Sequence, residues 1–234
     1  VHCGFCTATC PTFTLLGDEL DSPRGRIYLI KDMLENDRPA DKTIVKHIDR
    51  CLSCLACMTT CPSGVHYMHL VDHARIHIEK TYKRPFADRL MRSVLAFVLP
   101  YPKRFRLALI SAYFGRPFAG LLKMMGGPLA RMGAMLELAP AKAPGRGQLE
   151  GPGVFAAESP KRKGRVALLS GCAQPVLNPG INDATIRLLR RAGYEIVMPK
   201  GEVCRGAIVH HMGKEEASLE NARRNVDVWM KEAE

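Results

Sequence analysis

The 234-residue sequence contains no apolar run long enough to cross a membrane, which takes about 20 consecutive residues in a helix. Its longest apolar stretch, around residues 94–99, ends at Pro100. It also lacks a fingerprint for flavin or nicotinamide binding. We therefore expect a soluble or peripheral protein that performs no flavin or nicotinamide chemistry of its own.

Aromatic residues make up only 6% of the chain, and no compact Lys/Arg patch is interleaved with them. This composition argues against nucleic-acid binding. Acidic residues are outnumbered, with 23 Asp and Glu against 34 Lys and Arg, so the formal charge is +11. A positive balance of this size suits an acidic partner protein or an anionic membrane surface.

Seven of the nine cysteines form two runs near the start of the chain. The second run has the spacing C-x2-C-x2-C-x3-C followed by Pro62, and the first has the same pattern without its leading cysteine, followed by Pro11. The seven residues are Cys3, Cys6, Cys10, Cys51, Cys54, Cys57 and Cys61. This spacing is typical of a pair of [4Fe–4S] clusters, so the sequence predicts an electron carrier.

In two-cluster ferredoxins the fourth cysteine of each run binds the other cluster. One predicted cluster is therefore held by Cys10 together with Cys51, Cys54 and Cys57. The other is held by Cys3, Cys6 and Cys61, and its fourth ligand would precede Val1. Each oxidised cubane with four thiolates carries a net charge of about −2, so two clusters would offset roughly four of the positive charges.

Two other uses of cysteine are weaker interpretations. Disulfides would require an oxidising compartment, but the cysteine number is odd and no signal peptide is evident. Zinc prefers separated C-x2-C pairs or a mixture with histidine, and three cysteines at x2 spacing are too dense for one tetrahedral ion. His66, His69, His73 and His77 offer a further metal site in principle. We expect them to be exposed helix residues instead.

The chain divides into three predicted regions. Residues 1–85 form the cluster module, in which Asp21, Ser22 and Pro23 begin a helix that turns Ile27, Ile30, Met33 and Leu34 toward a core and ends between 36 and 39. Arg24 and Arg26 lie in its first turn, either solvated or in contact with a cluster or partner.

The second predicted region, residues 86–163, has two parts. Short basic amphipathic helices broken by proline are expected first, and they serve docking or, less favoured, lie on a membrane. Residues 140–163 are rich in Pro, Gly and Ala, and this composition predicts a flexible linker.

Residues 164–234 predict a strand at 165–170, a helix from Asn178 to Gly193 and a parallel strand at 195–198, followed by a helix at about 214–232. The sequence predicts one helix face that carries Ile181, Ala184, Leu188, Leu189 and Ala192. Cys172 and Cys204 follow the two strands, so their thiols either converge or are two unrelated buried cysteines.

Residues 16–28, 49–54 and 60–65 resemble the iron–sulfur subunit of glycolate oxidase (glycolate dehydrogenase). Residues 171–176, 181–185 and 210–213 resemble the first cysteine-rich (CCG) domain of that family. The resemblance implies an α+β, mostly helical protein: a ferredoxin-like helical module, a helical linker and an α/β CCG domain. It also implies two [4Fe–4S] clusters and a further iron–sulfur centre at Cys172 and Cys204.

The family implies a function in which a separate FAD-containing subunit oxidises glycolate to glyoxylate. The iron–sulfur subunit passes the electrons toward a quinone-type or other membrane acceptor, so it carries no catalytic residue for the substrate. A cytoplasmic protein, peripheral at the inner face of the cytoplasmic membrane, is implied. The alternative is the same subunit in a lactate or glycerol-3-phosphate dehydrogenase or a heterodisulfide-reductase-like complex.

The chain departs from the family pattern at three places. Its first cysteine run is incomplete, and it ends before the remaining cysteines of the family, so we expect a fragment that lacks both ends. Arg205 stands where the family has the second of two adjacent cysteines. An arginine cannot act as a thiolate ligand to iron, so the resemblance leaves cluster binding and disulfide reduction by the CCG domain in doubt.

Overall fold

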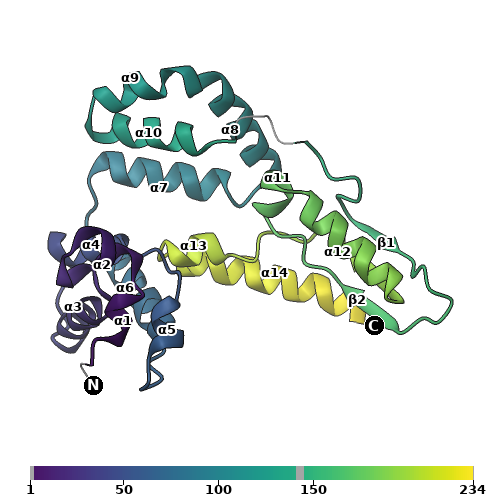
Figure 1. Cartoon of the computed structure of the whole chain (residues 1–234), viewed down its shortest axis with the longest axis horizontal. Coiled ribbons are helices and arrows are strands. Elements are labelled where there is room, and N and C mark those ends of the chain that lie inside the picture. Colours follow the sequence, from purple (N-terminus) through teal and green to yellow (C-terminus); the bar gives the residue numbers. More distant parts are fainter. Residues whose placement is uncertain (1–2, 141–144, 234) are drawn as a thin grey trace. The chain divides into compact units, whose positions relative to one another are not determined.

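The computed structural model describes residues 3–140 and 145–233, and Figure 1 shows a chain made mainly of helices. Its contacts divide it into two compact units. The first comprises the chain up to Arg84 together with Val209–Glu215; the second comprises Pro85–Ile208 and Glu216–Glu234. The expected mostly helical fold with a small sheet is confirmed. The limits of the three predicted regions stay a prediction.

The first unit is helical, and its cysteine runs lie in the connections between short helices. Before Arg84 its elements are α1 (Phe5–Ala8), α2 (Pro11–Leu16), η1 (Glu19–Asp21), α3 (Pro23–Glu35), α4 (Lys42–Asp49), α5 (Ala56–Thr60) and α6 (Tyr67–Thr81). Pro11 is the first residue of α2, where its missing N–H costs no helical hydrogen bond. Pro11 therefore begins α2, and Pro62 lies between α5 and α6.

Helix α3 begins as its sequence predicts. The Ser22 side chain accepts a hydrogen bond from the Gly25 N–H at 2.9 Å, and Pro23 is the first helical residue. Ile30 and Met33 are buried, whereas Leu34 is 40% exposed. The expectation that Leu34 faces the core is therefore wrong, because the buried stripe of α3 passes through Arg26, Ile30 and Met33 instead.

The core of the first unit is formed where α3, α4 and α6 meet. Its fully buried members include Met33 from α3, Ile44 and Ile48 from α4, and Ala74 and Ile78 from α6. Cys57 and Tyr67 belong to the same cluster of buried residues. The apolar core therefore extends directly to the cysteine loop and gives it a rigid base.

A segment distant in sequence completes this unit. Val209–Glu215 packs on α6, where a Cβ on Gly213 would lie 2.4 Å from the Arg75 carbonyl oxygen. His211 Nδ1 lies 3.0 Å from Asp72 Oδ1, and His210 Nε2 lies 3.4 Å from Asp72 Oδ2. Glycine is required at 213 by this close approach as well as by its φ of 79°.

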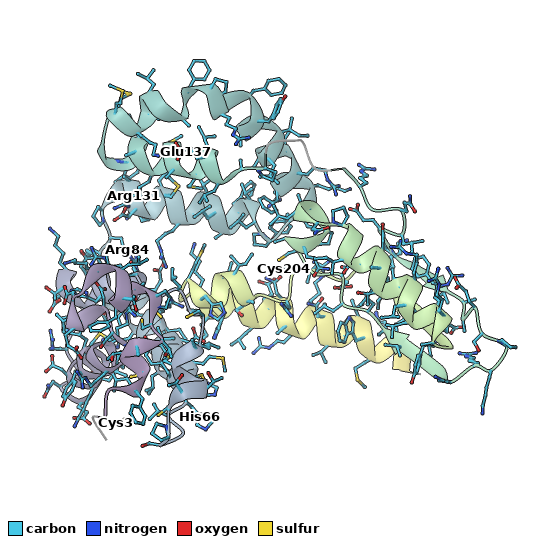
Figure 2. All side chains as sticks on the ribbon, viewed as in Figure 1. Cys3, His66, Arg84, Arg131, Glu137 and Cys204 are labelled. Carbon is cyan, nitrogen blue, oxygen red and sulfur yellow. The ribbon has the colours of Figure 1, made fainter. Side chains whose placement is uncertain are left out.

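The second unit begins with the predicted proline-broken helices: α7 (Phe86–Val98), α8 (Pro102–Gly115), η2 (Arg116–Phe118), α9 (Ala119–Met124) and α10 (Gly127–Leu138). Lys123 of α9 and Glu137 of α10 form an ion pair at 2.7 Å, and Glu137 is labelled in Figure 2. Many large apolar side chains stay exposed, among them Phe97 at 61% and Phe114 at 71%. Over the described residues, no helix is both long and apolar enough to span a membrane.

The small sheet has the strand order β1–β3–β2. Strands β2 (Gly164–Ala167) and β3 (Tyr194–Met198) are parallel, as predicted, with Val166 opposite Ile196. Strand β1 (Gly153–Phe155) pairs antiparallel with β3 and lies within the predicted linker, so the linker expectation is wrong there. Residues 141–144 of that linker lie outside the described residues.

Helix α12 (Gly180–Arg191) joins the parallel strands, and α11 (Gln174–Leu177) precedes it. Its buried side chains are Asp183 and Ile186, whereas Ile181 and Leu188 are 49% and 68% exposed. The predicted apolar face is therefore wrong. The Asp183 carboxylate accepts hydrogen bonds from the Gln148 and Leu149 N–H groups, which turns this polar residue inward. After α13 (Ala207–His211), helix α14 (Glu215–Ala233) ends the description.

Gly25 allows the close approach of η1 to α3. A Cβ at this position would lie 2.0 Å from the Glu19 carbonyl oxygen, which is backbone and cannot move aside cheaply. We expect Gly25→Ala to lower the free energy of unfolding by about 3 kcal/mol. Gly120→Ala is the control, because nothing lies within 4 Å of a Cβ there and alanine favours its helix. Thermal unfolding of both variants checks this; equal midpoints would contradict it.

Candidate iron–sulfur site

The second cysteine run lies in an irregular loop between α4 and α5. Ser53 and Leu55 have left-handed φ values of 52° and 59°, although neither is glycine. Each such residue costs about 1–2 kcal/mol, and strain of this kind gathers at functional sites. Arg75 of α6 holds the loop, donating to Ser53 Oγ at 2.7 Å and to the Cys51 carbonyl at 2.9 Å.

The structure brings Cys10 to this loop. One small cavity is lined by the four residues Cys10, Cys51, Cys54 and Cys57. Cys10 and Cys57 are buried, Cys51 is half-buried and Cys54 is exposed. Three of these residues come from one loop and the fourth from 41 or more positions earlier, which is the crossed grouping expected of a two-cluster ferredoxin.

The remaining cysteines of the two runs form a second group. Cys3, Cys6 and Cys61 line a neighbouring cavity of about 240 Å³, to which Cys57 also contributes. Gly4, with a φ of 79°, makes the turn between the first two. The second cavity is thus adjacent to the first, because Cys57 borders both.

Hydrogen-bond donors surround the sulfur atoms. The backbone N–H groups of Val65, Ser63 and Gly64 lower the pKa of the Cys61 thiol. Burial raises the pKa of Cys10, but the Thr12 hydroxyl, the backbone N–H groups of Phe13 and Thr12, and Arg26 outweigh it, so the net shift is downward. The Tyr67 hydroxyl lies 3.5 Å from Cys51 Sγ. These donors favour thiolates, the form that binds iron.

Two thiols are shifted in the opposite direction. Burial, followed by the charges of Cys51 and Cys54, raises the pKa of Cys57 to about 11. Burial also raises the pKa of Cys6. Both must therefore lose a proton when iron binds, so cluster assembly at these two cavities releases protons.

The donor geometry fits a cubane better than zinc. A tetrahedral zinc with Zn–S bonds of about 2.3 Å needs its sulfur atoms roughly 3.8 Å apart. In the described part of the chain, no three cysteine sulfur atoms lie within 4.8 Å of one another. Four soft sulfur donors line one cavity and suit the four iron corners of a [4Fe–4S] cluster, each of which takes one thiolate.

Among the described residues, the four histidines at 66–77 form no group of ligand atoms close enough to hold a metal ion together. His66, labelled in Figure 2, is exposed, as are His69 and His73. His77 is half-buried, and its Nε2 lies 3.0 Å from the Arg38 carbonyl oxygen. In the described residues, the prediction of exposed helix histidines is confirmed for the first three, and His77 is held by the backbone instead.

In the second unit, Cys172 and Cys204 converge: their side chains are in hydrogen-bonding contact. The hydrogen bond with Cys204 and burial raise the pKa of Cys172. The same hydrogen bond, with the Gly206 N–H and the charge of Arg205, outweighs burial and lowers the pKa of Cys204 to about 6. Two thiols supply at most two of the four thiolates that a cubane takes, and Arg205 cannot add a third, so a further cluster at Cys172 and Cys204 stays a prediction.

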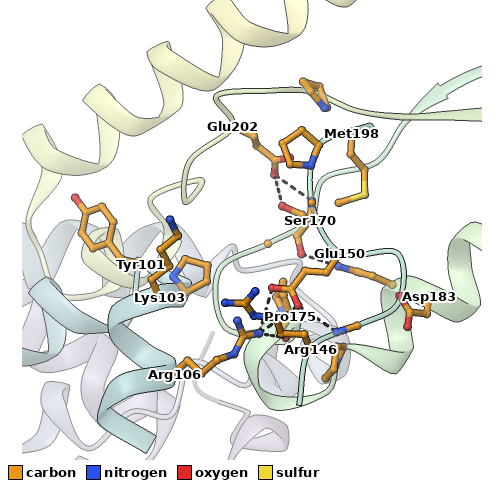
Figure 3. A pocket seen from close by; sticks show the side chains of 18 of the residues that line it. Tyr101, Lys103, Arg106, Arg146, Glu150, Ser170, Pro175, Asp183, Met198 and Glu202 are labelled. Carbon is orange, nitrogen blue, oxygen red and sulfur yellow. Dashed lines mark hydrogen bonds and ion pairs between the residues drawn. The ribbon is translucent and has the colours of Figure 1, made fainter. Parts of the chain in front are cut away.

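A cavity of about 630 Å³ in the second unit lies at the carboxyl ends of β2 and β3 (Figure 3). Ser170 and Glu202 meet there: the Ser170 N–H and hydroxyl lie 3.0 and 3.2 Å from Glu202 Oε1. Burial raises the pKa of Glu202. Neither Cys172 nor Cys204 is among its lining residues, so the thiol pair is separate from this cavity.

Comparison with known proteins agrees with this geometry. A family model described as a 4Fe-4S dicluster domain matches residues 1–65, and one described as a cysteine-rich domain matches residues 166–234. The chain thus carries a region similar to a 4Fe-4S dicluster domain, followed by a region similar to a cysteine-rich domain. Two [4Fe–4S] clusters are the cofactors that this domain indicates. No solved structure matches the chain.

The chain is 45% identical to the glycolate oxidase iron-sulfur subunit of Escherichia coli (strain K12) over 230 residues, which are 98% of this chain and 51% of the relative. It is 34% identical to the probable glycolate oxidase iron-sulfur subunit of Bacillus subtilis (strain 168) over 236 residues, 97% of this chain and 52% of the relative. The resemblance predicted from the sequence is confirmed. The chain spans about half the length of the curated relatives it matches.

Arg205 and Cys172 should together determine the thiolate at Cys204. We expect alkylation of Cys204, followed by mass spectrometry across a pH series, to reach half its maximal rate at a pH well below that of an ordinary cysteine, because the pKa of Cys204 is lowered. Arg205→Leu removes a positive charge and should move that midpoint to higher pH, and Cys172→Ser should do the same by weakening the hydrogen bond. Arg191→Leu, in the exposed last turn of α12, is the control. A midpoint common to all four proteins would contradict the assignment.

Proposed function

We propose that this chain is the electron-carrying subunit of a flavin-dependent glycolate oxidase. A partner subunit with FAD oxidises glycolate to glyoxylate, and this chain passes the electrons toward a membrane acceptor. The crossed grouping of seven cysteines carries the proposal, because it supports two adjacent electron carriers. The 45% identity to a subunit named for glycolate oxidase supports the substrate.

The proposed ligands follow the two cavities. Cys10, Cys51, Cys54 and Cys57 hold one cluster, and Cys3, Cys6 and Cys61 supply three ligands of the other. When bound, each cubane accepts one electron and spreads it over four irons with little change in geometry. The protein contributes the donors to sulfur and the apolar core beneath Cys57, both of which tune a cluster's potential.

Cys57 supports transfer between the two carriers. Its side chain borders both cavities, so no other element of the chain separates them at this point. Because Cys61 is four residues further on, one helical turn (α5) links the two ligand groups. A short covalent connection of this kind holds the two proposed clusters at a fixed separation.

Helices α7 to α10 suit partner docking. They expose large apolar side chains, such as Met124 at 86% and Leu138 at 85%, next to basic residues. An apolar surface rimmed by charge is typical of a protein or membrane interaction site. We assign this surface to the flavin-containing subunit, with the membrane as the less favoured partner.

Reduction by glycolate tests the proposal directly. The purified protein is mixed under anaerobic conditions with its flavin-containing partner subunit, and glycolate is added. We expect the paramagnetic resonance signal of reduced [4Fe–4S] clusters, and a weaker signal with lactate. A signal with lactate or glycerol 3-phosphate but not with glycolate would assign the chain to a different dehydrogenase.

Loss of one cysteine should remove one cluster. In a form of the protein that also supplies the fourth ligand of the Cys3/Cys6/Cys61 cluster, we expect Cys54→Ala to lower the visible cluster absorbance and the iron content by about half, because one of two cubanes loses a ligand. Cys172→Ala is the matched control and should leave both values unchanged, since Cys172 lies outside both cavities. Iron and labile sulfide analysis measures the effect. Unchanged iron in Cys54→Ala, or zinc in place of iron, would refute the ligand assignment.

A further inference from the structure

Arg26 is a buried cation beside a proposed cluster ligand. Its side chain is 1% exposed, and so is enclosed as completely as the apolar core around it. Arginine is almost never fully buried unless it is paired. The helix start at Ser22 explains why Arg26 lies in α3, but it does not explain why the side chain of Arg26 is buried. The contacts of that side chain must explain the burial.

The Arg26 guanidinium contacts four different residues. Nε donates to the His47 carbonyl at 2.8 Å, Nη2 donates to Thr12 Oγ1 at 3.0 Å, and Nη1 lies 3.8 Å from Cys10 Sγ. Nη2 is also 3.4 Å from Asp21 Oδ1. The planar fork is thus held in one orientation by oxygen acceptors on two sides, and its remaining nitrogen faces sulfur.

The negative charge of Asp21 is stabilised by residues other than Arg26. This carboxylate is fully buried, with His47 Nδ1 at 2.9 Å and Arg50 Nη1 at 2.7 Å, both closer than Arg26. Hydrogen bonds from His47 and Arg50 outweigh burial and lower the pKa of Asp21. The buried guanidinium therefore has a surplus of positive charge, and the Cys10 sulfur is the anion that can match it.

We propose that Arg26 raises the reduction potential of the cluster held by Cys10, Cys51, Cys54 and Cys57, and that Asp21 limits this effect. The inference rests on the proposed ligand set. Reduction adds one negative charge to the cluster, and a cation hydrogen-bonded to sulfur in a dry interior favours the more negative state. A buried carboxylate near the same guanidinium opposes it.

Within residues 3–140 and 145–233, the other cysteine group has no buried guanidinium of this kind. Arg24 is the guanidinium near Cys6, but its side chain is 34% exposed and pairs with Glu19 at 2.8 Å. Water screens a charge at such a position far more than one in the interior. The two proposed clusters therefore differ in their nearest fixed charge, which separates their potentials.

The test is an anaerobic redox titration of the purified protein, followed by paramagnetic resonance. The reduction wave of the Cys10 cluster is identified as the one absent from Cys54→Ala. We expect Arg26→Gln to lower the equilibrium constant for its one-electron reduction by at least about tenfold, which corresponds to about 59 mV. Asp21→Asn should shift the same wave in the opposite direction. A merely structural role would not give opposite signs.

Arg84→Gln is the matched control. Arg84 is also a mostly buried arginine paired with a carboxylate, Asp49, and none of its hydrogen bonds or ion pairs involves a cysteine. It should leave both waves in place. Arg26→Lys keeps the charge without the planar fork, so its potential should lie between those of the parent and Arg26→Gln.

Each outcome decides a separate point. Full iron content with an unmoved or raised potential in Arg26→Gln overturns the role of Arg26 and leaves the ligand set intact. If Arg26→Gln binds no cluster, the Asp21→Asn variant decides instead. A reduction potential of the Cys10 cluster that is not raised in Asp21→Asn overturns the inference. Retention of both waves in Cys54→Ala would mean that the proposed ligand set itself is wrong.

Discussion

The structure depends on one constraint: several thiolates must be stabilised close together in a small helical unit. Burial raises the pKa of Cys57, and the charges of Cys51 and Cys54 raise it further. The surrounding chain offsets this repulsion with donors: backbone N–H groups at Cys61, hydroxyls of Thr12 and Tyr67, and the guanidinium of Arg26. The helices are placed so that these donors reach the sulfur atoms, and the apolar core of α3, α4 and α6 fixes them there.

Local patterns predicted local features well. The cysteine spacing and the rule that the fourth cysteine crosses over predicted two groups of ligands. The same residues line the two cavities, with Cys57 at both, and the ligand assignment itself stays a prediction. The start of α3 followed from Ser22 and Pro23, since a cap involves neighbours only. The parallel pairing of β2 and β3 followed from the strand–helix–strand order.

The local sequence pattern did not predict features that depend on contacts between residues far apart in the chain. Whether Arg26 is solvated or buried is decided by the His47 carbonyl of α4, 21 residues away, which no local spacing reveals. Strand β1 has only three residues in a Gly/Pro-rich segment and exists because β3 offers a free edge. The buried face of α12 is reversed because Asp183 binds backbone N–H groups near residue 148. A signal for Arg26 existed in retrospect: an arginine on the same helical stripe as Ile30 and Met33.

The packing of Val209–Glu215 on α6 affects how the cluster-binding part can be isolated. Excision of the chain after Arg84 would remove His210 and His211 from Asp72, a carboxylate only about 10% exposed, and uncover the backbone against which Gly213 lies. Asp72 is also 3.8 Å from Arg75, the residue that grips the cysteine loop. A fragment that ends at Arg84 would therefore lose the contacts that position Asp72. This loss would weaken the support of Arg75 and of the cysteine loop, although every cysteine of the loop would still be present.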